Sequence, residues 1–332
     1  MILERLDTRE VDWDLLDAFH DRVVFQTRQW VEFIADSQTA EPIIAAVNDG
    51  GGRPIGYFTG LLVRRYGLSL LGSPLPGWTT SFLGFNLEPG VSRRAATEAL
   101  LEFAFGELRC AHLELRDRNL PAAEVEGLGF DATPWRGLEV DLDRPEDEIF
   151  ASFKSECRTA IRKADKQGVV VEEAEGPGFA DEFYPQLVDV FEKQSLAPPY
   201  DAERIRTLIR HVHPSGRLLL LRARDAGGRC VATGIFPALN RSMHFLAGAS
   251  WRDAQRLRPN EALTWHAMRH WRERGIRVCD LGGYMDYKRK YGGEEVHLPF
   301  LRRSRSAPVA ALRGVARAAF DARQRLRGRL RS

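Results

Sequence analysis

Two periodicities of apolar and polar residues run along the chain, and together they predict a mixed α/β (α+β) fold. Alternating segments rich in β-branched side chains predict strands at 43–47, 55–63, 68–71, 112–115, 131–141, 217–224, 229–239, 242–249 and 276–281. Segments with apolar residues every three or four positions predict helices at 92–108, 146–166, 179–195, 202–212 and 259–274. Ser92 is the expected N-cap of the first of these helices.

The order of the predicted elements repeats within the chain. At 95–115 and again at 264–281, an amphipathic helix passes through a short polar joint into a strand that ends in a charged residue. A duplicated α/β unit explains this repeat. We therefore predict domains at 1–143 and 144–301, followed by a tail at 302–332.

The composition is that of a soluble protein. Of the 332 residues, 44% are hydrophobic and 28% are charged, which excludes disorder or a fibrous structure for most of the chain. No apolar run approaches the ~18–20 residues that span a bilayer, and the first ten residues are too charged for a signal peptide. We expect a cytoplasmic protein.

Cysteine and histidine spacing does not predict a metal site. The four cysteines form no CxxC pair, so we expect reduced thiols. His266 and His270, like His211 and His213, are close enough in the sequence to share a metal ion. No carboxylate or cysteine stands beside either pair at a supporting spacing, so we predict no metal.

The tail at 302–332 is strongly basic. It contains ten arginines and one aspartate, a formal charge of +9, whereas the whole chain carries +2. Val309, Leu312, Ala316 and Phe320 fall near one face of a helix. Such a segment can lie on the anionic inner membrane or along an RNA backbone. The alternative is a solvated basic tail.

Lysines are scarce and clustered. The chain has six lysines and 42 arginines, and no lysine precedes Lys154. Three lie at 154–166 and two lie at 288–290, which indicates places that need an amine, unless the clustering is due to chance.

The predicted helix at 146–166 carries a basic ridge. Cations recur every four residues at Lys154, Arg158, Arg162 and Lys166, with Lys163 beside them. Like charges at this spacing cost on the order of 1 kcal/mol in total. An anionic ligand would offset this cost: a nucleotide, a lipid diphosphate or the backbone of a tRNA. The alternative is a solvated face on which nearby carboxylates relieve the repulsion.

A second constellation follows the predicted strand at 276–281. Gly282 and Gly283 allow a ligand to approach the backbone closely. Asp280 offers a base, and Lys288 and Lys290 offer cations. This set suits amide formation, in which an amine loses a proton while the attacked carbonyl gains negative charge. A structural Gly-Gly turn is the alternative.

A third constellation lies at 250–261, between a predicted strand and a helix. This arrangement resembles the acyl-donor site of GNAT acyltransferases, in which a glycine-rich loop holds the coenzyme A pyrophosphate. Here the glycines are missing, and Pro259 has no N–H to donate. We therefore do not expect coenzyme A to bind in the usual GNAT manner.

Several segments occur in the order seen in the FemAB-like family, which the chain resembles over most of residues 20–301. They are Val24–Trp30, Arg158–Val169, Arg258-Pro259-Asn260-Glu261, Asp280-Leu281-Gly282-Gly283 and Lys288–Gly293. The resemblance implies two tandem GNAT-like domains, each a mixed central sheet flanked by helices. It also implies transfer of an aminoacyl group from a charged tRNA to an amine of a peptidoglycan precursor.

The resemblance also implies roles for individual residues. Lys290 and Tyr291 belong to the catalytic segment, with Lys290 stabilising the oxyanion or protonating the leaving oxygen. The cations Arg158, Arg162, Lys163, Lys166 and Lys288, together with Pro259, Asn260, Gly282 and Gly283, would hold a phosphorylated or lipid-linked substrate. Asp280 is a candidate base. The chain lacks the coiled-coil insertion of the bridge-forming enzymes, which weakens the transfer of tRNA specificity.

The leading hypothesis is an amide-forming N-acyltransferase that acts on a cell-envelope precursor of peptidoglycan or polysaccharide. It needs no bound cofactor, and its co-substrate is an aminoacyl-tRNA. One alternative is an acyl-coenzyme A-dependent N-acetyltransferase that acts on a small amine. Another is a non-catalytic module that binds RNA or a membrane surface.

Overall fold

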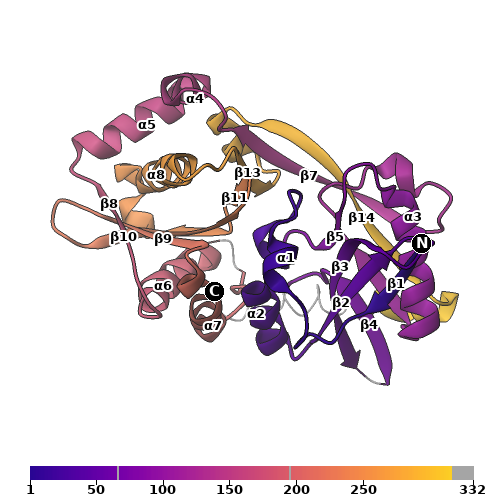
Figure 1. Ribbon diagram of the computed structural model, residues 1–332. Helices are drawn as coiled ribbons and strands as arrows, with labels where there is room; N and C mark the ends of the chain where they lie inside the picture. Colours follow the sequence, from indigo (N-terminus) through magenta and orange to yellow (C-terminus); the bar gives the residue numbers. More distant parts are fainter. Residues whose placement is uncertain (66, 194–195, 316–332) are drawn as a thin grey trace. The chain divides into compact units, whose positions relative to one another are not determined.

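The computed structural model describes residues 1–65, 67–193 and 196–315 (Figure 1). It divides into two compact units. The first comprises Met1–Trp135 and the segment that starts at His297, and the second comprises Arg136–Val296. The boundaries predicted from the sequence are 143 and 301. The units divide earlier because two long strands, β7 (Asp131–Asp141) and β14 (Glu294–Ser304), each run from one unit into the other.

The first unit contains a mixed sheet in the order β1-β2-β3-β4-β6-β14. Its strands are β1 (Ile2–Arg5), β2 (Glu41–Asn48), β3 (Pro54–Arg65), β4 (Leu68–Ser73), β6 (His112–Leu115) and the second part of β14, while β5 (Gly84–Leu87) pairs with β3. Only β4 and β6 run parallel among these pairs. Residues 43–48 of β2 are buried at every position, which requires cover on both faces of the sheet.

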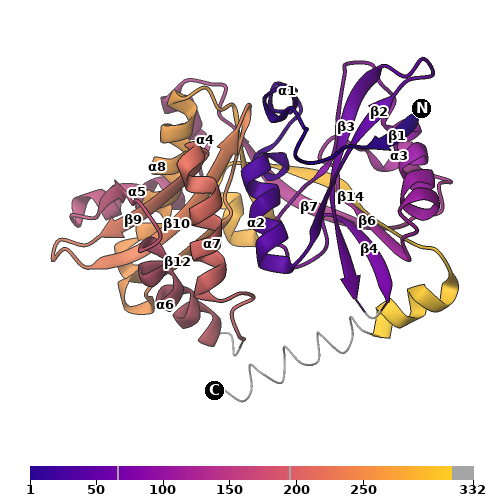
Figure 2. The ribbon, with the colours of Figure 1, turned by 60° about the horizontal axis from the view of Figure 1, so that its bottom comes forward.

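Helices supply that cover. The first unit has α1 (Trp13–Asp17), α2 (Arg28–Gln38) and α3 (Arg93–Glu102), with short helical turns at Val24–Gln26, Phe103–Glu107 and Ala122–Val125. Figure 2 shows α2 and α3 on opposite faces of the strands. The Ser92 side chain accepts a hydrogen bond from the backbone N–H of Ala95, which confirms the predicted N-cap.

The second unit contains a mixed sheet in the order β7-β13-β11-β10-β9-β8. Its further strands are β8 (Val170–Glu173), β9 (Leu218–Arg224), β10 (Cys230–Leu239), β11 (Ser242–His244) and β13 (Val278–Gly283), and β12 (Ala247–Ser250) also pairs with β10. Only β11 and β13 run parallel among these pairs. The predicted strand at 242–249 is therefore two strands.

Helices cover both faces of the second sheet. They are α4 (Glu146–Ser152), α5 (Ser155–Lys166), α6 (Phe179–Glu192), α7 (Ala202–Val212) and α8 (Pro259–Glu273), with 3-10 turns at His213–Ser215, Arg252–Leu257 and Asp286–Tyr291. α8 lies on one face, with α5 packed on it, and α6 and α7 lie on the other (Figure 1). The mixed α/β architecture of two helix-covered sheets confirms the predicted fold class.

The predicted helix at 146–166 is interrupted. Phe153 and Lys154 have extended backbones, so α4 ends at Ser152 and α5 begins at Ser155. The Arg158 guanidinium donates hydrogen bonds to the carbonyl oxygens of Ala151 and Phe153. These contacts satisfy carbonyls at the end of α4 that no longer have helical partners. The prediction of one helix through 146–166 is therefore wrong, and Lys154 lies at the N-cap of α5, before the other cations of the ridge.

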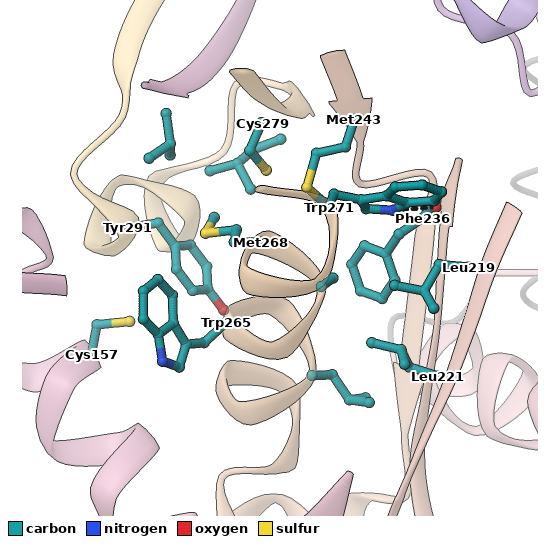
Figure 3. Close-up of a cluster of buried hydrophobic side chains, with 14 of the residues drawn as sticks. Cys157, Leu219, Leu221, Phe236, Met243, Trp265, Met268, Trp271, Cys279 and Tyr291 are labelled. Atoms are coloured by element: carbon teal, nitrogen blue, oxygen red, sulfur yellow. Dashed lines mark hydrogen bonds between the residues drawn. The ribbon is translucent and has the colours of Figure 1, made fainter. Parts of the chain in front are cut away.

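The core of the second unit forms between α8 and the sheet. Trp265, Met268 and Trp271 project from α8 and pack with Leu221 and Phe236 of the strands (Figure 3). Cys157 of α5 and Tyr291 of the last 3-10 turn complete one end of this cluster. The core therefore fixes the positions of α5, α8 and the 286–291 turn relative to one another.

The first residues of the predicted tail, which starts at 302, belong to a strand of the first unit. Residues 301–304 pair with β6, and the Arg302 side chain is buried. Arg303 donates to the carbonyl of Leu128, and Arg313 pairs with Glu114. Residues 307–315 are helical with Leu312 exposed, and the rest of the predicted amphipathic face, including Phe320, lies outside the described residues. In the described part of the chain, no helix has the length and apolarity needed to cross a membrane.

Candidate active site

A split between neighbouring strands opens a cavity in the second unit. β11 runs parallel to β13, and the last bond of this contact runs from the Phe245 N–H to the Asp280 carbonyl, 2.8 Å away. The next N–H, of Leu246, donates instead to the Ile235 carbonyl of β10, and β12 continues the pairing along β10. β12 and β13 therefore diverge after Phe245, and the space between them is not closed by backbone pairing.

The cavity at this split has the size and lining of a small-molecule site. Its volume is about 480 Å³, within the usual range for ligand pockets. Apolar walls come from Phe191, Phe236, Phe245, Leu263 and Leu281, and polar groups come from Thr233, Ser250, Asn260, Glu261, Lys288 and Lys290. Apolar walls with polar groups at fixed positions are typical of a site that orients a reacting group.

Lys290 and Glu261 form an ion pair at the edge of this cavity. The Lys290 Nζ lies 2.7 Å from Glu261 Oε1, and the two side chains are only 18% and 9% exposed. Glu261 belongs to the first turn of α8, where the helix dipole favours a negative charge. The aromatic rings of Tyr287 and Tyr291 lie 5.9 Å and 5.3 Å from the ammonium group. The pair is therefore held in place and reaches the cavity.

A second cavity meets the first at the same ion pair. It has a volume of about 560 Å³ and is lined by Ser155, Glu156, Thr159, Ala160, Lys163, Arg258, Glu261, Tyr287 and Lys290. Glu261, Tyr287 and Lys290 line both cavities. Lys163 and Arg258 add positive charge to the second cavity alone, and Glu156 adds one negative charge there. An anionic group in the second cavity and a reacting group in the first would therefore both contact Lys290.

Lys288 holds the glycine turn that follows β13. Its Nζ donates to the carbonyls of Leu281, at 2.6 Å, and Gly283, at 3.3 Å, and lies 5.4 Å from the Phe245 ring. Burial lowers the pKa of Lys288, while nearby Asp280 opposes that shift. Gly282 has a φ of +77°, which favours glycine. Lys288 therefore binds backbone carbonyls in this structure, although it also lines the first cavity.

Asp280 lies outside the lining of both cavities. It is 1% exposed, and its Oδ2 lies 3.1 Å from His244 Nδ1. Its Oδ1 accepts a hydrogen bond from the Gly282 N–H at 2.6 Å. These bonds tie β13 to β11 and shape the glycine turn. The geometry favours a structural role, and a role as the base stays a prediction.

Tyr291 anchors the 286–291 turn in the core. Its hydroxyl hydrogen-bonds with Thr264 of α8, and its ring meets the Phe153 ring edge to face at 5.7 Å. Burial raises the pKa of Tyr291 well above its ordinary value, although the bond to Thr264 opposes that shift. Tyr291 thus fixes the backbone that carries Lys290, and it lines the first cavity.

The predicted basic residues of α5 separate in the structure. Lys163 lines the second cavity beside Lys290. Arg162 instead lies 5.2 Å from the Phe150 ring, in another hollow. Arg158 binds the carbonyls between α4 and α5, and Lys166 lies in the last turn of α5. Of these four, only Lys163 shares a cavity with Lys290, so a common phosphate site for all of them stays a prediction.

The start of α8 brings together two predicted residues and two that were not singled out. Pro259 occupies the first helical position, and the Asn260 side chain donates to Ser250 Oγ at 2.9 Å. Sequence reasoning missed Glu261 and Ser250 as site residues. The signal for Glu261 was present, because it ends the Arg258–Glu261 segment of the family resemblance and lies in the first turn of a predicted helix.

We expect Gly292→Ala to destabilise the second unit by roughly 3 kcal/mol. The alanine would strain the backbone, and its Cβ would also clash with a neighbouring carbonyl. Gly292 has a φ of +68°, and a Cβ there would lie 2.4 Å from the Ser152 carbonyl oxygen. Gly178→Ala is the matched control, since a Cβ at Gly178 meets nothing within 4 Å. Chemical denaturation measures both variants, and equal midpoints would contradict this role of Gly292.

Comparisons with known proteins agree with this geometry. An acetyltransferase (GNAT) domain model matches residues 151–289, which contain most of the lining of both cavities. A comparison with curated protein sequences finds no significant match.

Solved structures extend the similarity to most of the chain. The crystal structure of FemX is 15% identical, with a TM-score of 0.73, and the match covers 90% of this chain and 96% of FemX. The C-terminal domain of a putative lysylphosphatidylglycerol synthetase from Agrobacterium fabrum is 12% identical, with a TM-score of 0.52 and coverages of 85% and 89%. A tandem GNAT protein from the clavulanic acid biosynthesis pathway is 15% identical, with a TM-score of 0.51 and coverages of 91% and 98%. The chain is therefore an acyltransferase that has a GNAT domain at 151–289 and the fold of FemX.

Proposed function

We propose that the protein transfers an aminoacyl group from an ester donor to a primary amine of a phosphorylated cell-envelope precursor. The observation that carries this proposal is the Lys290–Glu261 ion pair at the meeting point of two cavities. The FemAB-like resemblance supports the choice of an aminoacyl-tRNA as donor. The same resemblance supports a cell-envelope precursor as the acceptor.

The pair suits both halves of amide formation. The amine nitrogen attacks the ester carbonyl, the C–N bond forms, and the C–O bond to the donor breaks. The Lys290 ammonium stabilises the negative charge that develops on the carbonyl oxygen. Glu261 accepts the proton that the attacking amine loses and passes it to the departing oxygen as the C–O bond breaks, so that the donor leaves as an alcohol and Glu261 is again a carboxylate. The two side chains supply a cation and a carboxylate within 2.7 Å of each other.

The second cavity suits the phosphorylated part of a substrate. Lys163, Arg258 and Lys290 are lysine and arginine side chains that can donate to phosphate oxygens. The hydroxyl groups of Ser155 and Thr159 add donors on the same wall. A phosphate bound there would sit beside the ion pair, so that the amine of the same molecule can enter the first cavity.

The start of α8 counts against coenzyme A as the donor. Arg258 has a left-handed backbone, Pro259 has no N–H, and the Glu261 carboxylate already occupies the first turn. A pyrophosphate at this helix start would lack the backbone N–H donor that residue 259 would otherwise supply. An ester donor needs no such pyrophosphate site. We therefore rank the aminoacyl ester above the acyl-coenzyme A alternative.

A donor screen tests the proposal. Purified protein is incubated with a mixture of charged tRNAs, or with acyl-coenzyme A, and with a uridine diphosphate-linked amino-sugar peptide as acceptor. We expect amide product, detected by mass spectrometry, only with the charged tRNAs. Product from coenzyme A thioesters alone would overturn the choice of donor.

The same assay separates an enzyme from a binding module. A variant that ends at Val315 lacks six of the ten arginines of residues 302–332. An enzyme whose site lies at Lys290 keeps its turnover on the soluble acceptor after this truncation. If neither the full chain nor the truncated variant forms amide, and truncation abolishes binding to RNA or to anionic vesicles, the module that binds RNA or a membrane surface is favoured instead.

A further inference from the structure

A cluster of two histidines and a glutamate lies away from the two cavities described above. His266 and His270 are one helical turn apart on α8, and Glu173 ends the edge strand β8. His270 Nδ1 lies 2.9 Å from Glu173 Oε1. None of the three lines either cavity that contains Lys290. The proposed acyl transfer does not use them.

The three side chains converge on one point. One ligand atom from each residue lies within 4.8 Å of the ligand atoms of the other two. Ligand atoms around a tetrahedral zinc ion stand about 3.4 Å apart, given metal–ligand bonds of about 2.0–2.2 Å. Small side-chain rotations would bring the ligand atoms to the shorter separation. The Glu173 side chain can rotate in this way, because it is 56% exposed.

The helix fixes the two imidazoles before any ion arrives. Residues four apart on an α-helix project from the same face, so His266 and His270 stand one above the other. The His270 side chain is 9% exposed, and its ring packs against Trp271 at 5.1 Å. Little conformational entropy is lost when these residues bind an ion, which favours binding.

The side-chain types of the cluster suit a transition-metal ion. Two imidazoles and one carboxylate are ligands that zinc prefers. Of the neighbouring cations, Arg274 donates to the His270 carbonyl, which directs its guanidinium to the helix backbone.

We propose that Glu173, His266 and His270 form a binding site for a divalent transition-metal ion, with Zn²⁺ as the ion that this donor set fits best. Three protein ligands leave the fourth tetrahedral position to water. The bound ion would join the edge strand β8 to α8, and so strengthen the side of the sheet opposite to β7. The site is independent of the proposed acyl transfer.

Zinc titration tests this site. The full chain, with no histidine tag and stripped of metal by a chelator, is titrated with Zn²⁺ in a calorimeter. We expect one ion per chain and a rise in the melting temperature on binding. Glu173→Gln and His266→Ala should each weaken binding at least ~10-fold and abolish the rise in melting temperature. The Glu173 variant is the safer readout, because its exposed side chain can change without loss of the fold.

His20→Ala serves as the matched control, because His20 is exposed and lies in the first unit. This variant should bind zinc as tightly as the wild type. The proposal is overturned if the wild type takes up no zinc. It is equally overturned if Glu173→Gln and His266→Ala bind zinc with the affinity of the His20 variant. Amide formation is not part of this test, so a failure of the proposed function leaves its result unaffected.

Discussion

Lys290→Ala is expected to lower kcat for amide formation by roughly 100- to 1000-fold, the usual effect of removing one donor from an oxyanion-stabilising site. The loss appears in kcat because Lys290 is proposed to act mainly on the charge that develops in the transition state. Product formation under saturating substrates measures kcat, and thermal unfolding measures stability in parallel. We expect the change in melting temperature to be small beside the loss of rate.

Two further variants make this result interpretable. Lys290→Ala leaves the Glu261 carboxylate, which is 9% exposed, without its cation. Such a loss can destabilise the fold. The double variant Lys290→Met with Glu261→Gln removes both charges together and should fold even if the single variant does not. Lys193→Ala is the control for loss of a lysine, since Lys193 is exposed and lines neither cavity. A Lys290 variant that is folded and turns over at the wild-type rate would remove this residue from the mechanism.

Glu261→Gln is expected to lower kcat by roughly 100-fold or more, because it removes the carboxylate that accepts the proton of the attacking amine. Glutamine has nearly the same shape and still accepts a hydrogen bond from Lys290, so we expect unfolding to change little. The pH dependence gives a second readout. The rate of the variant should rise steadily with pH, since it then depends on the fraction of substrate amine that is already deprotonated.

Asn260→Ala is the matched control for this prediction. Asn260 precedes Glu261 in the same helical turn and lines the first cavity, and its side chain is bonded to Ser250 rather than to Lys290. Its loss should affect KM more than the pH profile. If Glu261→Gln has the wild-type rate and pH profile, Glu261 only positions Lys290, and the proton must go elsewhere.

Elements with a strong local signal were predictable from the sequence. The helix predicted at 202–212 is α7, Ala202–Val212, and the strand predicted at 112–115 is β6, His112–Leu115. The N-cap at Ser92 is confirmed as well. In each case the signal lies within a few residues of the element, as apolar periodicity or a capping side chain. The helix-covered sheets of the fold follow from the alternation of such elements.

Interruptions within elements were not predictable. The break at Phe153 depends on bonds from Arg158 to the carbonyls of Ala151 and Phe153, and from the Lys154 N–H to the Lys290 carbonyl. The split of the strand at 242–249 depends on Phe245 and Leu246, whose N–H groups bond to different strands. The bonds of Lys154, Phe245 and Leu246 reach partners that lie 11 or more residues away in the chain, so the local periodicity of apolar residues does not show these interruptions.

The sequence by itself determined the classes of the elements, the repeat of α/β units and the choice of Lys290 as a candidate. Only the tertiary structure decided which charged groups meet. It set Glu261 against Lys290 at 2.7 Å, turned Arg158 to backbone carbonyls and brought Glu173 to His266 and His270. The physical reason is the distance along the chain over which each kind of interaction acts. Periodicity and capping act over a few residues, whereas an ion pair or a ligand set needs groups that folding brings together from distant parts of the chain.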